Sequence, residues 1–122
     1  MVKLKRAYEE PDPGDGRRIL VDRLWPRGVK KTEARLAAWL KELAPSDELR
    51  HWFDHNPARW EEFQQRYRKE LTAPEKAGVI EDLLSQARQG TVTLIFAARD
   101  QERNNAVVMK NLLEERLGAA AR

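Results

Sequence analysis

The chain has 122 residues, no cysteine and a formal net charge of +3, with 41% hydrophobic and 35% charged residues. These figures predict one globular domain over residues 1–122, and the missing cysteine excludes disulfides, thiolate metal sites and a cysteine nucleophile. The first residues lack the apolar segment of a signal peptide, and no apolar run approaches the roughly 18 residues of a membrane span. We therefore expect a cytoplasmic protein with no membrane partner.

Two strands are expected near the N-terminus. Residues 2–7 alternate apolar and basic side chains, as a half-buried strand does. Residues 9–16 form a loop rich in Pro, Gly and Asp, which Asp12 and Asp15 are expected to shape. Residues 18–24 have a continuous apolar centre, which indicates a strand buried on both faces in a parallel sheet. The Trp-Pro-Arg-Gly turn that follows, residues 25–28, ends this strand.

The middle of the chain is predicted to be helical, with one ambiguous stretch. Thr32 can cap a short helix that runs through Leu36. Residues 37–43 either extend that helix, as propensity favours, or form a short strand with Trp39 packed inward. Ser46 can cap a helix that ends near His55, because its hydroxyl can accept from the free amides of the first turn. The two acidic residues that follow it suit the positive end of the helix dipole.

Three more elements precede the final helix. Asn56-Pro57 opens a helix, and residues 72–75 match a capping box for the next one, which Gly90 ends. Residues 91–98 are β-branched and aromatic, the strongest strand pattern in the chain. Asn104 or Asn105 caps the last helix; Gly118 is expected to end it, and the Ala-rich tail to fray. The apolar stripes assigned to these three helices are Trp60, Phe63, Tyr67 and Leu71, then Ile80, Leu83, Leu84 and Ala87, then Val108, Leu112, Leu113 and Leu117.

This order of elements predicts a single α/β domain with a short, mainly parallel, Rossmann-like sheet flanked by helices. The carboxyl ends of parallel strands share one edge, where such sheets bind ligands. The residues expected at that edge are Asp22, Arg23, Trp25, Arg27 and Gly28 after the second strand, and Arg99, Asp100, Arg103, Asn104 and Asn105 after the last. Lys41 and Ser46 join them if residues 37–43 form a strand.

Arginines at this edge favour an anion, because a guanidinium binds phosphate or carboxylate as a two-pronged fork. We predict that Arg23, Arg27 and Arg99 hold a small anionic or phosphorylated ligand and that Trp25 walls its pocket. Asp22 and Asp100 would orient the arginines or act as acid and base. In a purely structural alternative, Asp22 pairs with an arginine and pins the end of the sheet.

Two histidines and several aromatic residues are further candidates. His51 and His55 lie four residues apart, a spacing that can bind metal, but no HExxH pattern surrounds them, so no metal or cofactor is predicted. His55 could serve as a catalytic acid or base or simply be stabilised by the end of its helix. The helical aromatic residues are interpreted as core. No GxSxG, Walker A or GxGxxG motif occurs, so whether the protein is an enzyme stays open.

Several motifs together resemble a known family. The motifs in question are, in chain order, LVDRLWPRG, APS with LRHWF and DH, RWEEFQQRYRKEL, AARD and NNAVV. Together they resemble domain-of-unknown-function family 488 in its short YeaO-like branch. The resemblance covers residues 8 to about 113 and implies a compact bacterial α/β domain, which favours a strand over residues 37–43. The site it implies comprises Tyr8, Asp15, Arg18, Asp22, Arg23, Trp25, Arg27, Lys41, Ser46, His55, Asp100 and Asn105.

The chain departs from that family at one loop. Members often carry histidine before the Asn-Ala pair that follows the last strand, where this chain has Arg103 before Asn104, and longer members carry a Cys-His pair nearby. If that histidine or cysteine performs chemistry, this chain has lost or replaced it. A methyltransferase label carried by some members finds no support, because the chain has no glycine-rich methyl-donor loop.

Three functions follow as hypotheses. The first is binding of a small anion at the strand ends, with transfer or hydrolysis at a phosphate or glycosidic bond if the protein is an enzyme. The second is a nucleic-acid-binding module, suggested by dense basic residues in the first third of the chain. The third is a non-catalytic interaction protein, and the oligomeric state is open. The basic residues behind the second hypothesis are Lys3, Lys5, Arg6, Arg17, Arg18, Lys30, Lys31 and Arg35.

Overall fold

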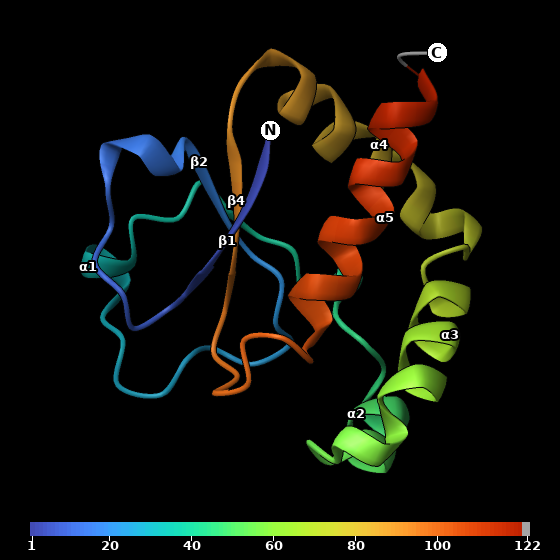
Figure 1. Cartoon of the computed structure of the whole chain (residues 1–122). Coiled ribbons are helices and arrows are strands. Elements are labelled where there is room, and N and C mark those ends of the chain that lie inside the picture. Colours follow the sequence, from blue (N-terminus) through green and yellow to red (C-terminus); the bar gives the residue numbers. More distant parts are fainter. Residues whose placement is uncertain (121–122) are drawn as a thin grey trace.

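The computed structural model describes residues 1–120, with side chains through residue 118, and contains four strands and five α-helices in that range (Figure 1). The strands are β1 (Val2–Arg6), β2 (Arg17–Leu20), β3 (Ala38–Trp39) and β4 (Val92–Phe96). The helices are α1 (Lys31–Ala34), α2 (Asp47–Phe53), α3 (Trp60–Glu70), α4 (Pro74–Gln89) and α5 (Asn105–Ala120). Short 3-10 turns cover Pro13–Asp15, Lys41–Leu43 and Pro57–Arg59.

The four strands form one sheet in the order β1-β4-β2-β3, and every neighbouring pair is parallel. The last strand in the sequence therefore lies in the middle of the sheet, which explains why all five of its residues are buried. Its neighbours β1 and β2 run in the same direction on either side of it. This arrangement confirms the predicted α/β class and brings the carboxyl ends of all four strands to one edge.

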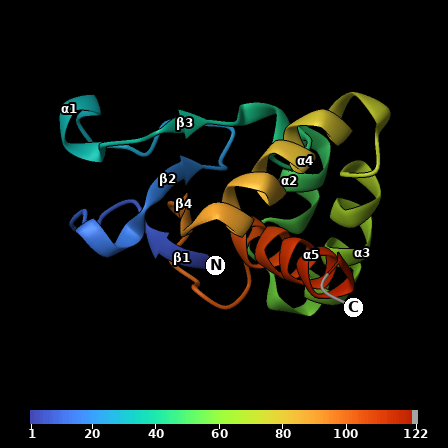
Figure 2. The ribbon, with the colours of Figure 1, turned by 90° about the horizontal axis from the view of Figure 1, so that it is seen from above.

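The larger helices lie on one face of this sheet. Figure 2 shows α2, α3, α4 and α5 together on one side, with α1 and the loop between β1 and β2 on the other. Ile19, Leu94 and Phe96 face the helices and belong to the main core. Leu20 and Ile95, which alternate with them, are buried on the opposite face. The molecule therefore has two principal layers, and loops cover the second face of the sheet.

The second strand is shorter than the sequence predicts, ending at Leu20 instead of Leu24. The amide of Val21 still donates to the carbonyl of Ile95, but the next ladder position is taken by a side chain. The Asp22 carboxylate accepts the amide of Ala97 at 2.9 Å. A side-chain acceptor thus replaces the strand ladder and leaves residues 22–28 as a loop.

The ambiguous stretch 37–43 is a two-residue strand followed by a 3-10 turn, as the family resemblance suggested and against helix propensity. Hydrogen bonds from Ala37 to Arg18 and from Leu40 to Leu20 tie this stretch to β2. Pairing with a buried strand therefore overrides local propensity.

Three predicted helix ends are wrong. Helix α1 begins at Lys31, so Thr32 lies inside it and is not its cap. The capping box at 72–75 does not form, because the Thr72 hydroxyl donates back to the carbonyl of Lys69. Gly118 lies inside α5, which continues to Ala120. The expected fraying of the tail falls partly on residues 121–122, outside the described residues.

Three other predicted ends are confirmed. Ser46 caps α2 by accepting the amide of Leu49, and Gly90 is the C-cap of α4. Of the two candidates for α5, Asn104 is the cap, since its side-chain oxygen accepts the amide of Val107. Among residues 1–120, no helix is long and apolar enough to cross a membrane.

Candidate functional site

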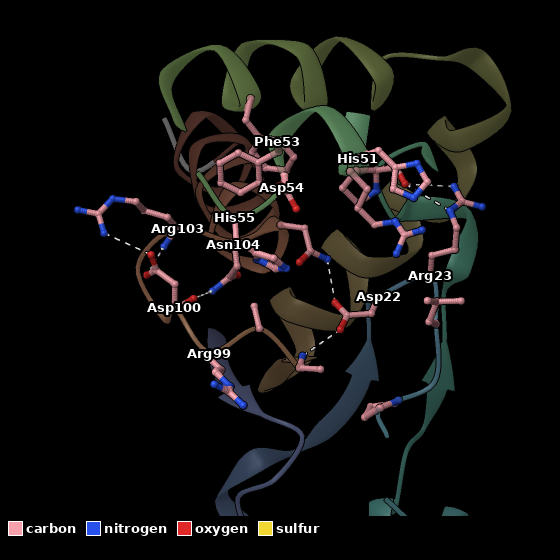
Figure 3. A pocket seen from close by; sticks show the side chains of 18 of the residues that line it. Asp22, Arg23, His51, Phe53, Asp54, His55, Arg99, Asp100, Arg103 and Asn104 are labelled. Carbon is pink, nitrogen blue, oxygen red and sulfur yellow. Dashed lines mark hydrogen bonds and ion pairs between the residues drawn. The ribbon is translucent and has the colours of Figure 1, made fainter. Parts of the chain in front are cut away.

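A pocket of about 860 Å³ opens at the carboxyl edge of the sheet (Figure 3). It lies among the ends of β1, β2 and β4, the C-terminal end of α2 and the start of α5. The predicted site residues that line it are Tyr8, Asp22, Arg23, Trp25, Arg27, His55, Arg99, Asp100, Arg103, Asn104 and Asn105. The topology of the sheet therefore brings most of the strand-end residues into one cavity, as the parallel arrangement predicted.

Asp22 lies near the middle of this pocket. In Figure 3 it lies between the Asp100–Arg103 loop on one side and Arg23 with His51 on the other. One of its oxygens accepts the Ala97 amide at 2.9 Å and the other accepts Asn105 Nδ2 at 3.0 Å. Burial raises the pKa of Asp22 above 3.8, although both hydrogen bonds and the charge of Arg50 act in the opposite direction.

The loop between β4 and α5 is organised by Asp100. Its carboxylate accepts the amides of Glu102 and Arg103 and the Arg103 guanidinium, at 2.9, 3.0 and 3.3 Å. The bond from the Glu102 amide, followed by those from Arg103, holds the pKa of Asp100 below its ordinary value. Asp100 is thus a carboxylate that shapes the loop and partly neutralises Arg103.

Two arginines share one acidic partner on the opposite wall. Arg50 donates through Nη2 to Asp47 at 2.9 Å, and Arg23 Nε lies 3.5 Å from the same carboxylate. Arg23 also donates to the carbonyl of Pro45. Arg50 Nε is buried and has no hydrogen-bond partner within the described residues. A buried N–H without an acceptor costs about 1–3 kcal/mol, so such groups in native proteins call for an explanation.

The turn after β2 is fixed by two tryptophans. The Trp25 indole donates to the carbonyl of Val29 at 2.7 Å, and its ring meets Trp39 edge-to-face, with centroids 5.4 Å apart. Trp39 in turn donates to the carbonyl of Asp22 at 2.7 Å. These contacts fix the loop that carries Asp22 and Trp25 into the pocket. Arg27 lies on the same loop and is exposed.

The segment after α2 is backbone-strained. Asp54 and His55 have φ angles of +46° and +52°, a left-handed conformation that is uncommon for residues other than glycine. Both side chains line the pocket. His55 therefore lies just past the C-cap of α2 and does not continue the helix. No group of three or more metal-ligating side chains occurs within residues 1–120.

Of the predicted site residues, Asp15, Arg18, Lys41 and Ser46, together with Gly28 of the turn, lie outside the pocket lining. Arg18 is buried on the second face of the sheet, where its Nη1 donates to Asp15 at 2.6 Å. Ser46 donates its hydroxyl to Glu70 at 2.6 Å and so ties α2 to α3. Lys41 lies over the ring of Trp39, 4.2 Å from its centroid. Arg18, Ser46 and Lys41 each have a structural partner within the fold.

Three of the eight basic residues behind the nucleic-acid hypothesis are engaged within the fold. Lys5 pairs with Asp15 at 2.9 Å beside the buried Arg18. Arg6 donates to the carbonyls of Ala97 and Ala98 at 3.0 and 2.9 Å. Fewer of these side chains are therefore free to contact a nucleic-acid backbone.

Sequence reasoning missed several pocket residues on α2 and its end, above all Arg50, Phe53 and Asp54. Their positions depend on how α2 packs beside the sheet edge, which no local pattern reveals. The unusual Phe-Asp-His-Asn-Pro junction is the one signal that could have indicated a strained turn.

A family model described as the inactive DUF488-N3 subclade matches residues 1–122. The chain belongs to this family. This result confirms the resemblance that the motifs indicated. An uncharacterised protein of Mycobacterium tuberculosis is 41% identical over 115 residues, covering 94% of this chain and 95% of its own. The uncharacterised protein YeaO of Escherichia coli is 39% identical over 112 residues, covering 92% and 96%. No solved structure matches the chain.

Proposed function

We propose that this DUF488-N3 protein binds a small phosphorylated anion in the pocket at the sheet edge without converting it. The observation that carries the proposal is the convergence of five arginines on this pocket, from the loop after β2, from α2 and from the loop between β4 and α5. A phosphate would use the two-pronged geometry of these guanidinium groups.

The charge balance of the pocket favours an anion. Five arginines line it against three aspartates, and one of these aspartates already pairs with Arg103. Arg27 and Arg99 form no ion pair with the described residues. Several cations in one concave site attract an anionic ligand and raise its local concentration.

The polar groups are arranged for binding more than for proton transfer. Both oxygens of Asp22 accept fixed donors. His51 and His55 form no side-chain hydrogen bond with the part of the chain that the structure describes, so neither has a group that orients it as a catalytic base would require. The description of the family as inactive agrees with a binding role.

The test is calorimetric titration with ribose 5-phosphate and pyrophosphate of the wild type, Arg50→Met and Arg88→Met. Arg88 is an exposed arginine on α4 and controls for the loss of one charge. Loss of a charged hydrogen bond should weaken binding roughly 10- to 150-fold in Arg50→Met, with Arg88→Met unchanged. Equal affinities in all three proteins, or no binding to the wild type, would overturn the proposal. Conversion of a bound probe, seen by phosphorus NMR, would overturn its non-catalytic part.

A further inference from the structure

The pocket contains an aromatic surface that a bare phosphate would leave unused. We infer that the ligand is a nucleoside phosphate whose base stacks on Tyr8, an assignment that rests on the proposed phosphate site. The observation that points to it is the placement of exposed apolar side chains. Within the described residues, the exposed large hydrophobic side chains are Met1, Tyr8 and Leu24, and the last two both line the pocket.

Arg6 packs against the ring of Tyr8. The Arg6 guanidinium lies 5.0 Å from the centroid of the Tyr8 ring, while its Nε and Nη2 donate to the carbonyls at the end of β4. Arg6 is therefore fixed to the sheet and backs the ring through a cation–π contact. With one face covered, Tyr8 still has 49% of its surface exposed. A planar base on the remaining side would extend the stack that Arg6 begins.

The sheet places the Tyr8 ring at one end of the pocket and Arg23 and Arg50 at the other. Tyr8 follows β1, whereas Arg23 follows β2, and β4 lies between those strands. Two strand spacings separate the two ends by about 9.5 Å. A base on Tyr8 and a phosphate near Arg23 and Arg50 would need a spacer across the end of β4. A ribose is such a spacer.

The space between these ends suits a sugar. Ala97 and Ala98 line it with small side chains, and the carboxylate of Asp22 is a polar group that also lines it. A volume of about 860 Å³ falls in the range of roughly 300–1,000 Å³ typical of pockets for drug-sized ligands. A mononucleotide can therefore contact Tyr8 with its base, the polar centre of the pocket with its ribose, and Arg23 and Arg50 with its phosphate.

The experiment compares AMP, GMP, CMP, UMP, adenosine and ribose 5-phosphate by calorimetry on the wild type, Tyr8→Leu and Trp52→Leu. Trp52 is the matched control, because Arg66 lies 4.3 Å from its ring centroid and it lies outside the pocket lining. The wild type and Trp52→Leu should bind nucleotides roughly 5- to 150-fold more tightly than ribose 5-phosphate, the value of one stacked base. Tyr8→Leu should lose that advantage, and its affinity for ribose 5-phosphate should match that of the wild type.

Every other outcome overturns a defined part of the proposal, either the base stacking or the phosphate site. Equal binding of AMP and ribose 5-phosphate to the wild type, or full nucleotide affinity in Tyr8→Leu, would overturn the stacking while the phosphate site stands. Adenosine binding as tightly as AMP would overturn the phosphate site. Binding of neither phosphate compound would overturn both. A short single-stranded oligonucleotide that binds more tightly than AMP would replace the mononucleotide by single-stranded nucleic acid.

Discussion

Asn105 is hydrogen-bonded to Asp22 across 83 residues of sequence, with Nδ2 at 3.0 Å from the carboxylate and at 3.0 Å from the carbonyl of Val21. One amide thus joins the first turn of α5 to the end of β2. The second oxygen of Asp22 holds the end of β4 through Ala97. Three elements that are distant in the chain meet at a carboxylate in the centre of the pocket.

Replacing Asn105 by Ala should destabilise the fold by about 1–3 kcal/mol at pH 7, because two partly buried acceptors lose their donor. The same change removes an interaction that lowers the pKa of Asp22, so that pKa should rise further above 3.8. A carboxyl whose pKa is raised by folding contributes less to the stability of the fold as the pH rises through the interval between its unfolded and folded pKa values. The loss in Asn105→Ala should therefore be larger at pH 7 than at pH 3.

Urea denaturation at both pH values measures this difference, and carbon NMR of the Asp22 carboxyl follows its titration. Asn111→Ala is the control, since Asn111 is an exposed residue of the same helix. A loss that is equal at the two pH values would contradict the role assigned to Asn105.

The sequence predicted this edge well because parallel strands leave little choice about where their ends lie. The residues after β2 and β4 were identified from the apolar runs that precede them. The partner of Asp22 was not, because the pattern suggested an arginine and the fold supplies Asn105 and Ala97. Which donor reaches a carboxylate depends on the packing of α5 over the sheet, and that is a tertiary property.

Arg18 shows a second limit of the sequence. Its place on an expected strand near other arginines suggested a ligand-binding role, yet it is 4% exposed and bonded to Asp15 and the carbonyl of Ala34. Strand alternation puts it on the loop-covered face, but the boundaries of β2 were too uncertain to assign faces. Asp15 and Arg18 form a buried ion pair, which gives Arg18 a structural role in this chain.

Substitution of Asp15 by Ala should therefore cost about 3–5 kcal/mol, the usual penalty for leaving a buried charge unpaired. The buried Asp15 accepts both Lys5 and Arg18. Addition of Arg18→Met to Asp15→Ala should restore part of the loss, since it removes the orphaned charge. Thermal and urea unfolding of the single and double variants test this. A loss below about 1 kcal/mol in Asp15→Ala, or a double variant less stable than the single one, would refute it.

Arg27 gives the opposite expectation, an effect on binding without an effect on stability. It is exposed, lines the pocket and forms no ion pair among the described residues. Arg27→Ala should change the free energy of unfolding by no more than about 0.5 kcal/mol while weakening pyrophosphate binding roughly tenfold or more. Calorimetry beside Arg88→Ala, which removes an exposed arginine elsewhere, separates a local contact from a general charge effect. Equal weakening in both variants would exclude a direct role for Arg27.

Asp100 provides a pH test of the loop that borders the pocket. Its folded pKa is lowered by the Glu102 amide and then by Arg103, so its carboxylate stabilises the fold at pH values above its unfolded pKa. That contribution is lost as the pH falls through the lower, folded value. Asp100→Asn should thus reduce the free energy of unfolding by about 0.2–1 kcal/mol at pH 7, the range for an exposed charged pair. The difference from the wild type should shrink below pH 3.8, whereas Glu114→Gln, at an exposed position on α5, should show neither effect. A difference that grows on acidification would mean that Asp100 is held in its protonated form, and would return it to the set of candidate acids.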